Sequence, residues 1–409
     1  MRVLLSTYDS RGGVEPLLAL AVQLQALGAQ AVLACPPDDE FAERAAGFGI
    51  PLVAFGPSVR AVTTAATRSS EEQLRTHVLG LIDAQFDTVA AAAQGCDALV
   101  STALVWTAAG ARSVADKLGI HYVYASYHPT HLPSPYHPPP EYVGRGMGTS
   151  EIDNRVMWDH NARNANALFG PTLNSRRASI GLPPVSDVRG YAYTDRPWLA
   201  ADPTLGPWQR LPGFDVMQTG AWLLPDDRPL SAELEEFLDA GPPPVYLGFG
   251  SMPLWGAKEV VPMAIAAIRA QGRRVLLARG WADLAPDGDA DDCFAIGEVN
   301  QQALFRRVAA VVHHGGAGTT TTAARAGVPQ VVVPQGPDQV YWALRVIALG
   351  IGSACDGPTP PVGALPAALE VALADETRAR ADAVGRDIAA DGAAVAAKLL
   401  LEAVSGEKL

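Results

Sequence analysis

Short apolar runs recur along the first half of the chain, and longer amphipathic stretches separate them. The runs predict buried strands at residues 2–6, 31–35, 52–55, 98–102 and 122–126. The first amphipathic stretch predicts a helix that begins near Glu15, has Pro16 in its first turn and ends at Gly28. Another stretch predicts a long helix over about 70–93. Strands that alternate with helices predict a parallel sheet with helices on both faces.

The second half of the chain repeats this alternation. Strands are expected over 245–251, around 311–313 and over 331–333. The similar peptides RVLLST and RVLLARG indicate two Rossmann-like units. Between the halves, residues 201–227 are rich in Pro and Gly without periodicity, which predicts a linker. The Ala-rich stretch 376–401 predicts a helix near the end of the chain.

The stretch HHGGAGTT, residues 313–320, interrupts an apolar run with glycines and continues as TTAARAG. This pattern predicts a strand, a tight turn and a helix. Backbone N–H groups in a first helical turn lack partners, and the helix dipole favours a phosphate there. The side chains of His314 and Thr319 would add hydrogen bonds to phosphate oxygens. The alternative is an ordinary glycine-rich turn with His314 as a hydrogen-bonded core histidine.

A second polar stretch follows about twenty residues later, where the apolar run 331–333 leads to the adjacent pair Asp338 and Gln339. In a parallel sheet, ligands bind outside the carboxyl ends of neighbouring strands. Both polar stretches are therefore expected to face one crevice.

Composition limits the class of partner. The 409 residues exceed what one hydrophobic core usually supports, so two domains are expected. The net charge of -12 argues against nucleic acid as a partner, because binding to its phosphates needs clustered Lys and Arg. The four widely spaced cysteines are expected to be reduced and structural. No signal peptide or run of about 18 apolar residues is present, so a cytoplasmic enzyme without a membrane span is expected.

Two stretches superficially suggest a metal site. The segment 128–140 contains His128, His131 and His137, but its many prolines favour an extended loop that does not converge the three rings. The acidic run 287–292 lacks the Gly and Glu that a calcium loop requires at positions six and twelve, and solvated acid is the better interpretation. No metal is expected.

The combination of HHGGAGTT with VPQGPDQ resembles the nucleotide-sugar site of GT-B glycosyltransferases. In detail, the chain is similar to the bacterial transferases that glycosylate glycopeptide antibiotic aglycones of the vancomycin and teicoplanin type. The matching peptides, in order, are SRG, SPYHPPP, GYAYTDRPWLAADP, QTGAW, PVYLGFGS, RGWADL and GEVNQQALF. The resemblance implies an α/β protein of two facing Rossmann-like domains. These are an acceptor domain at 1–205, a linker at 206–227, a nucleotide-sugar domain at 228–385, and a helix at 386–409 that returns to the first domain.

The resemblance also implies an activity. This activity is inverting, metal-independent transfer of glucose or N-acetylglucosamine from a UDP-sugar to a phenolic hydroxyl of a glycopeptide aglycone, with no cofactor. Donor contacts are implied for Ser10, Arg11, Ser251, Trp281, Val299, Asn300, His314, Gly316, Gly318, Thr319, Asp338 and Gln339. Acceptor contacts are implied for Tyr127, His128 and Tyr136. A core role competes for Trp281, and the pair Asp338 and Gln339 suits hexose hydroxyls.

The first loop departs from the family pattern. Relatives read SRGD, whose aspartate is the implied general base, whereas residues 10–13 are SRGG. Gly13 cannot accept a proton. Asp9, four residues earlier, is a candidate base, with turn capping as its alternative role. His128 and Asp338 are the other candidates. A phenol needs less basic assistance than an aliphatic alcohol.

Two other functions stay open at this point. A donor-binding pseudoenzyme that assists a partner transferase would explain Gly13. A nucleotide-sugar 2-epimerase shares the fold, although the proline-rich acceptor segment argues against it.

Overall fold

The computed structural model describes residues 1–65, 71–102, 104–142, 153–254, 259–286 and 291–406. The chain forms two compact units, each built from separate segments. The first unit comprises Met1–Ala201, Pro207–Leu224 and Ala390–Leu409, and the second comprises Asp202–Gly206 and Pro225–Ala389. Residues of the segment 206–227, expected to be a linker, thus belong to both units. Within the described ranges, no helix is both long enough and apolar enough to cross a bilayer.

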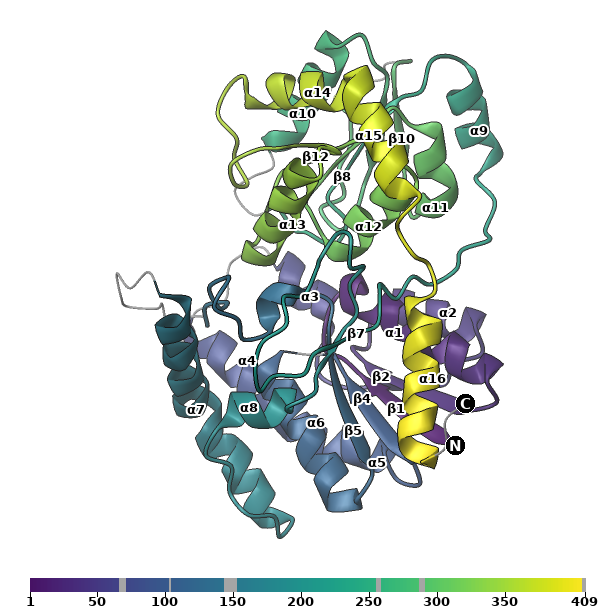
Figure 1. Cartoon of the computed structure of the whole chain (residues 1–409). Coiled ribbons are helices and arrows are strands. Elements are labelled where there is room, and N and C mark those ends of the chain that lie inside the picture. The colour runs from purple at the N-terminus through teal and green to yellow at the C-terminus, as the bar shows by residue number, and fades with distance from the viewer. Residues whose placement is uncertain (66–70, 103, 143–152, 255–258, 287–290, 407–409) are drawn as a thin grey trace. The chain divides into compact units, whose positions relative to one another are not determined.

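The first unit is built on a parallel sheet of seven strands in the order β3-β2-β1-β4-β5-β6-β7 (Figure 1). The strands are β1 (Arg2–Ser6), β2 (Gln30–Cys35), β3 (Leu52–Ala54), β4 (Ala98–Ser101), β5 (His121–Ser126), β6 (Trp198–Leu199) and β7 (Met217–Gln218). The five strands expected in this half are confirmed, with ends that agree to about one residue. The apolar runs of β4 and most of β1 are fully buried, because helices cover both faces of a parallel sheet.

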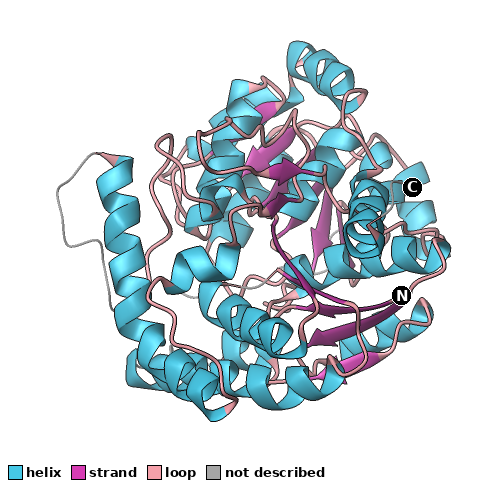
Figure 2. Ribbon diagram, turned by 60° about the horizontal axis from the view of Figure 1, so that its bottom comes forward, coloured by secondary structure: helices cyan, strands magenta, loops and turns pink. Residues whose placement is uncertain are grey.

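Helices flank this sheet, as Figures 1 and 2 show from two directions. They are α1 (Arg11–Ala26), α2 (Asp39–Gly47), α3 (Val59–Thr64), α4 (Glu71–Ala84), η1 (Gln85–Val89), α5 (Ala90–Ala92), α6 (Val105–Leu118), η2 (Pro129–His131), α7 (Asn154–Ser179), α8 (Val188–Tyr193) and α16 (Gly392–Ser405). The long helix expected over 70–93 is α4 and α5 joined through the π-helical turn η1. Its expected first residue, Ser70, lies outside the described residues.

Helix α1 starts earlier than the sequence predicts. Ser10 is its N-cap, and the carbonyl of Ser10 accepts the N–H groups of Gly13 at 3.0 Å and Val14 at 3.2 Å. The expected start near Glu15 is therefore wrong, and Pro16 lies inside the helix rather than in its first turn. The glycines before it adopt helical backbone here, so the loop after β1 ends at Ser10.

The second unit is built on a parallel sheet of six strands in the order β10-β9-β8-β11-β12-β13. The strands are β8 (Val245–Gly248), β9 (Val275–Ala278), β10 (Cys293–Ile296), β11 (Ala310–His313), β12 (Gln330–Val332) and β13 (Gly352–Ala354). The helices are α9 (Ala232–Asp239), α10 (Val260–Ala270), α11 (Gln301–Leu304), η3 (Phe305–Arg307), α12 (Ala317–Arg325), α13 (Pro337–Ala348), α14 (Ala364–Leu373) and α15 (Asp375–Gly385).

Both sheets have the doubly wound strand order, in which the first strand lies between the second and the fourth. The two Rossmann-like units predicted from the sequence are therefore confirmed. The two similar peptides that suggested these units do not occupy equivalent strands. RVLLST forms β1, the first strand of the first sheet, whereas RVLLARG contributes β9, the second strand of the second sheet. The topological switch points lie between β1 and β4 and between β8 and β11.

The last part of the chain contains two helices, and the single helix expected over 376–401 is wrong. Helix α15 packs on α12 and α14 in the second unit, whereas α16 packs on α1 in the first (Figure 1). The first helix ends at Gly385 and the second begins at Gly392. A Cβ atom added at Gly392 would lie 2.4 Å from the carbonyl carbon of Gly220, so only glycine permits this approach of the two backbones.

We predict that Gly392→Ala destabilises the first unit by about 1–3 kcal/mol, because the new methyl group has no space. Gly80→Ala in α4 is the matched control, since nothing lies within 4 Å of a Cβ atom at that position. Removing an exposed helical glycine should be neutral or add up to about 1 kcal/mol. Urea unfolding of both variants measures the difference, and equal effects would contradict the proposed packing.

Candidate functional site

In the second unit, the residues expected to bind a donor follow the carboxyl ends of five different strands. Ser251 follows β8, Trp281 follows β9, Val299 and Asn300 follow β10, the stretch His314–Thr319 follows β11, and Asp338 and Gln339 follow β12. The carboxyl ends of parallel strands meet at one edge of a sheet. The structure therefore brings all of these residues to the same edge, around the switch point between β8 and β11.

The turn between β11 and α12 has the strand, turn and helix geometry that the sequence predicts. Gly315 has a φ of 91°, Gly316 is the N-cap, and α12 begins at Ala317. The hydroxyl of Thr320 donates to the Gly316 carbonyl at 2.9 Å. Thr319, in the same turn, is only partly buried. The first N–H groups of a helix have no intrahelical acceptor, so this end of α12 presents backbone donors to an anion.

The ring of His314 lies between two glycines. An added Cβ atom would lie 3.3 Å from its Cε1 at Gly250 and 2.5 Å from its Nε2 at Gly316. Its Nδ1 is buried and makes no hydrogen bond with the described part of the chain. Burial lowers the pKa of His314 to about 4, although the Asp338 carboxylate opposes this shift. The ring is therefore neutral near pH 7 and is not a fully hydrogen-bonded core histidine.

The preceding residue, His313, is fully buried and fully hydrogen-bonded. Its Nδ1 accepts the N–H of Gly315 at 3.0 Å, and its Nε2 lies 2.9 Å from Oε1 of Gln330. Since Nδ1 accepts, the proton is on Nε2 and is donated to Gln330. Burial, assisted by His314, lowers the pKa of His313 to about 3. Sequence reasoning missed this pair, and the only signal was a polar residue in each of two apolar runs.

Gln339 acts within its own turn. Its Oε1 accepts the N–H groups of Gln335 at 2.7 Å and Gly336 at 3.1 Å, and its Nε2 lies 3.5 Å from the sulfur of Met252. The side chain is 6% exposed. The neighbouring Asp338 is partly exposed, and its charge reaches His314. Of the pair, Asp338 is therefore the better placed to meet a ligand.

The loops after β8 and β9 touch through glycine backbone. The N–H of Trp281 donates to the Gly250 carbonyl at 2.9 Å. A Cβ atom added at Gly280, whose φ is 55°, would lie 2.5 Å from that same oxygen. Trp281 is 9% exposed, which favours a packing role for its ring, and Ser251 beside this contact is partly buried.

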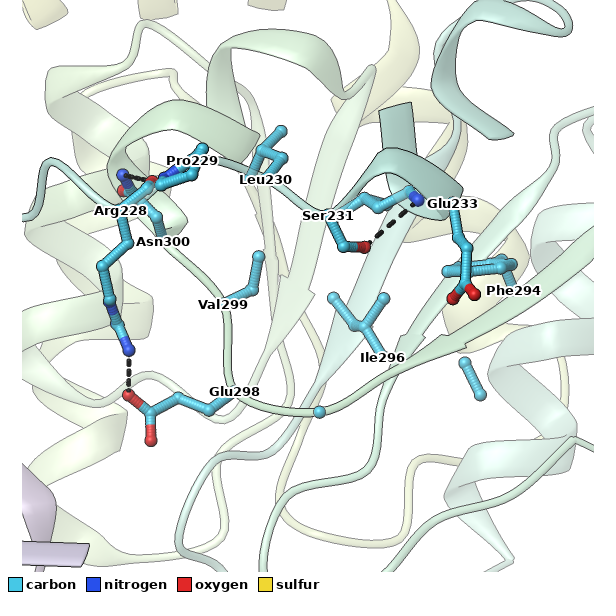
Figure 3. Close-up of a pocket in the computed structure, with 13 residues that line it drawn as sticks. Arg228, Pro229, Leu230, Ser231, Glu233, Phe294, Ile296, Glu298, Val299 and Asn300 are labelled. Atoms are coloured by element: carbon cyan, nitrogen blue, oxygen red, sulfur yellow. Dashed lines mark hydrogen bonds and ion pairs between the residues drawn. The ribbon is translucent and has the colours of Figure 1, made fainter. Parts of the chain in front are cut away.

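A cavity of about 400 Å³ lies beside β10 and the loop that follows it (Figure 3). Figure 3 shows Ile296 and Val299 pointing from this side toward the segment that carries Leu230 and Ser231. The residues that line it are Arg228, Pro229, Leu230, Ser231, Glu233, Leu234, Phe294, Ala295, Ile296, Gly297, Glu298, Val299 and Asn300. The cavity therefore includes Val299 and Asn300, two of the residues for which the resemblance implies donor contacts.

Asn300 has a structural role that the sequence did not reveal. Its Nδ2 donates to the carbonyl oxygens of Asp226 at 2.8 Å and Arg228 at 2.9 Å, while its Oδ1 accepts the N–H of Ala303 and caps α11. The guanidinium of Arg228 pairs at 2.9 Å with Glu298, which lies in the loop after β10. The loop after β10 is thus fastened to the segment at which the chain enters the second unit.

In the first unit, Asp9 occupies the volume that a side chain at position 13 would need. A Cβ atom added at Gly13 would lie 2.5 Å from Cβ and 2.7 Å from Oδ2 of Asp9. The Asp9 Oδ1 accepts the N–H of Ser10 at 2.6 Å, and Arg11 pairs with Glu15 at 3.3 Å within α1. The carboxylate therefore lies at the N-terminus of α1, where the helix dipole favours a negative charge.

Tyr127 contacts the first turn of α1. Its hydroxyl donates to the Gly13 carbonyl at 3.0 Å, and the residue is 7% exposed. Burial raises its pKa, and the nearby Asp9 carboxylate adds to this shift. The hydroxyl of Tyr127 is thus used inside the first unit, and the acceptor contact that the resemblance implies for this residue stays a prediction.

The aromatic side chains of the proline-rich segment 128–140 differ in packing and in exposure to solvent. The rings of His128 and His131 lie 4.9 Å apart, and the Ser126 hydroxyl holds the backbone of His128 at 2.8 and 3.1 Å. Tyr136 is 61% exposed and open to a ligand. Across the described ranges, no group of three or more His, Cys, Asp or Glu side chains is arranged to hold a metal ion. Residues 287–290 of the acidic run lie outside those ranges.

Comparisons with known proteins give the class and then the family. The family model "Erythromycin biosynthesis protein CIII-like, C-terminal domain" matches residues 291–400. A spinosyn forosaminyltransferase superposes with a TM-score of 0.71 over 99% of each chain at 19% identity. The glycosyltransferase VinC in complex with dTDP superposes with a TM-score of 0.66 over 95% of each chain at 20% identity. The fold is that of GT-B glycosyltransferases.

Two relatives match along essentially their whole length. The vancomycin aglycone glucosyltransferase of Amycolatopsis orientalis is 56% identical over 408 residues, which cover 100% of this chain and 99% of the relative. The dTDP-epi-vancosaminyltransferase of the same organism is 49% identical over 412 residues, with the same coverage. The chain belongs to the glycopeptide aglycone glycosyltransferase family, and it is a glycosyltransferase.

The two neutral histidines, His313 and His314, make the stability of the fold depend on pH. The folded pKa values, about 3 for His313 and about 4 for His314, lie below the ordinary value of 6.5. Between these values the unfolded chain binds more protons, so stability falls as pH drops from about 6.5 toward 4. We predict that His313→Asn removes up to about 1.4 kcal/mol per pH unit from this slope. Urea unfolding between pH 4.5 and 7 measures it, and an unchanged slope would refute the assignment.

Proposed function

We propose that the protein transfers glucose or N-acetylglucosamine from a UDP-sugar to a phenolic hydroxyl of a glycopeptide aglycone. Transfer proceeds with inversion and without a metal ion. We expect it in the cytoplasm, where nucleotide sugars are made. The observation that carries the proposal is the order of the site elements along the edge of the second sheet.

That order matches the parts of a nucleotide sugar. The three strand steps from β10 to β11 span about 14 Å, at about 4.8 Å per strand. An extended nucleoside diphosphate of this length would place its base near Val299 and Asn300 and its phosphates at the N-terminus of α12. The sugar would then lie beside the next strand, β12, near Asp338. Its carboxylate suits hydrogen bonds from hexose hydroxyl groups.

The same arrangement supports departure of the leaving group. Negative charge grows on the diphosphate as the bond to the anomeric carbon breaks. The unpaired N–H groups and the dipole of α12 stabilise this charge in the place where it develops. His314 is neutral, so it contributes a hydrogen bond rather than a positive charge. With the charge held by the backbone and this ring, the proposed reaction uses no metal ion.

The choice of acceptor rests on the relatives. The relative at 56% identity is named for the vancomycin aglycone, whereas the one at 49% is named for an epi-vancosaminyl group and for dTDP. The first of these names supports a glycopeptide acceptor for this chain. The second leaves a dTDP-sugar as the competing donor.

We propose Asp9 as the group that takes the proton from the attacking phenol. Its carboxylate is exposed at the carboxyl end of β1, beside the switch point of the first unit. It also fills the volume of a side chain at position 13. His128, which follows β5 at the same edge, and Asp338 in the donor unit are the competing candidates.

Transfer itself is tested with a mass-resolved assay. The purified protein, an unglycosylated heptapeptide aglycone and EDTA are incubated with UDP-glucose, UDP-N-acetylglucosamine or a dTDP-deoxyaminosugar. We expect the acceptor to gain the mass of one hexose or acetamidohexose from a UDP-sugar. Gain only from the dTDP-sugar would overturn the donor assignment. UDP binding without any gain across several aglycones would favour the auxiliary, non-catalytic alternative.

Exchanging positions 9 and 13 tests the base. We predict that Asp9→Asn lowers kcat by about 10²–10⁴, the usual contribution of a general base. Gly13→Asp alone should also lower activity, because two side chains would compete for one volume. The double variant Asp9→Gly/Gly13→Asp should recover much of the loss, since one carboxylate again fills that space.

His128→Ala and Asp338→Asn serve as comparison variants for the same kcat measurement. If Asp9→Asn keeps wild-type kcat while one of these two loses it, the proton is taken there instead.

A further inference from the structure

His313 is fixed in the second sheet by hydrogen bonds from both its backbone and its ring. It is the last residue of β11, between Gly248 of β8 and Val332 of β12, and its carbonyl accepts the N–H of Val333 at 2.8 Å. Its ring is fully buried. The side chain therefore cannot approach a ligand directly, and whatever it does for the site must act through a neighbour.

Both ring nitrogens of His313 are used. Nδ1 accepts the N–H of Gly315 at 3.0 Å, and Nε2 donates to Oε1 of Gln330 at 2.9 Å. Gln330 is also fully buried, at the start of β12, and its own N–H donates to the carbonyl of Ile351. A polar pair at the centre of an apolar sheet costs stability relative to apolar residues of similar shape. Its presence calls for a role beyond packing.

Gly315 is the group on which this pair acts. Its φ of 91° is a conformation that glycine adopts readily and other residues rarely adopt. Glycine also adopts many other conformations, so the backbone at Gly315 needs a contact that fixes it. A Cβ atom there would lie 2.7 Å from the Val332 side chain and 3.1 Å from the Gln339 carbonyl oxygen. Gly315 therefore packs closely against β12 and the first turn of α13. An acceptor fixed beside its N–H selects one conformation from the many that glycine allows.

We propose that His313 is a positioning residue for donor binding, whose Nδ1 holds the Gly315 N–H and thereby aims the N-terminus of α12 and the His314 ring at the donor phosphates. This role rests on the proposed function, because it takes the phosphate site to be at α12. Gln330 completes it by accepting a hydrogen bond from the Nε2–H group, which keeps the proton on Nε2 and leaves the lone pair of Nδ1 free for Gly315. Burial lowers the pKa of His313 to about 3, so protonation does not break this bond near neutral pH.

The chemistry of the ring gives a matched set of variants. In His313→Asn, the side-chain oxygen replaces Nδ1 and still accepts from Gly315. In His313→Gln, the polar end reaches the place of Nε2, and the acceptor for Gly315 is lost. Gln330→Met removes the partner that fixes the tautomer while keeping the length of the side chain. The ring can then carry its proton on Nδ1, which opposes the Gly315 N–H.

The test is titration calorimetry of UDP and of dTDP with the full-length protein, together with steady-state kinetics for both substrates. We expect His313→Gln and Gln330→Met to weaken nucleotide binding about tenfold or more and to raise the donor KM, with the acceptor KM unchanged. We expect His313→Asn to stay within about threefold of the wild type. Thermal melting of each variant reports the fold separately.

The outcomes separate the two claims. If the wild type binds a nucleotide and His313→Gln binds it equally well, the positioning role is overturned and the donor site stands. Equal loss in His313→Asn and His313→Gln also overturns it, because the retained acceptor would then make no difference. If the wild type binds neither UDP nor dTDP, both this role and the proposed donor site are overturned.

Discussion

Every proposed contact in the second unit depends on one property of parallel sheets, which is that all strands end at the same edge. Residues that are far apart in the sequence, from Ser251 to Gln339, reach one line because their strands run in one direction. The line also has an order, since neighbouring strands are about 4.8 Å apart. A ligand that is long and chemically different from end to end can therefore be recognised by the sequence of strand ends.

The proposed phosphate site depends on backbone donors rather than on a charged histidine. The chain carries a net charge of -12, and the two histidines before α12 are neutral near pH 7 because desolvation of their rings lowers their pKa. Backbone N–H groups and the helix dipole at the start of α12 supply positive potential there. Backbone donors can bind an anion only if the backbone conformation is fixed. This requirement explains why the side chains of His313, Gln330 and Gln339 make hydrogen bonds within the protein around the site.

Local patterns predicted the strands and the glycine turn well, and contacts between elements less well. The apolar runs of β1 and β11 are visible in any window of the sequence. The start of α1 was placed too late, because Pro16 is a helix-start signal and the cap at Ser10 lies upstream of two glycines. The bond between His313 and Gln330 depends on β11 and β12 being neighbours, and periodicity does not contain that information.

The volume shared by residues 9 and 13 has a consequence for how this chain can evolve. A carboxylate can occupy that space from either position, but two side chains cannot occupy it together. The two positions are therefore epistatic, and a lineage that moves the carboxylate must pass through an intermediate with two side chains or with none. A comparison made one position at a time would count Gly13 as a lost functional residue, whereas in three dimensions it is the substitution that makes room for Asp9.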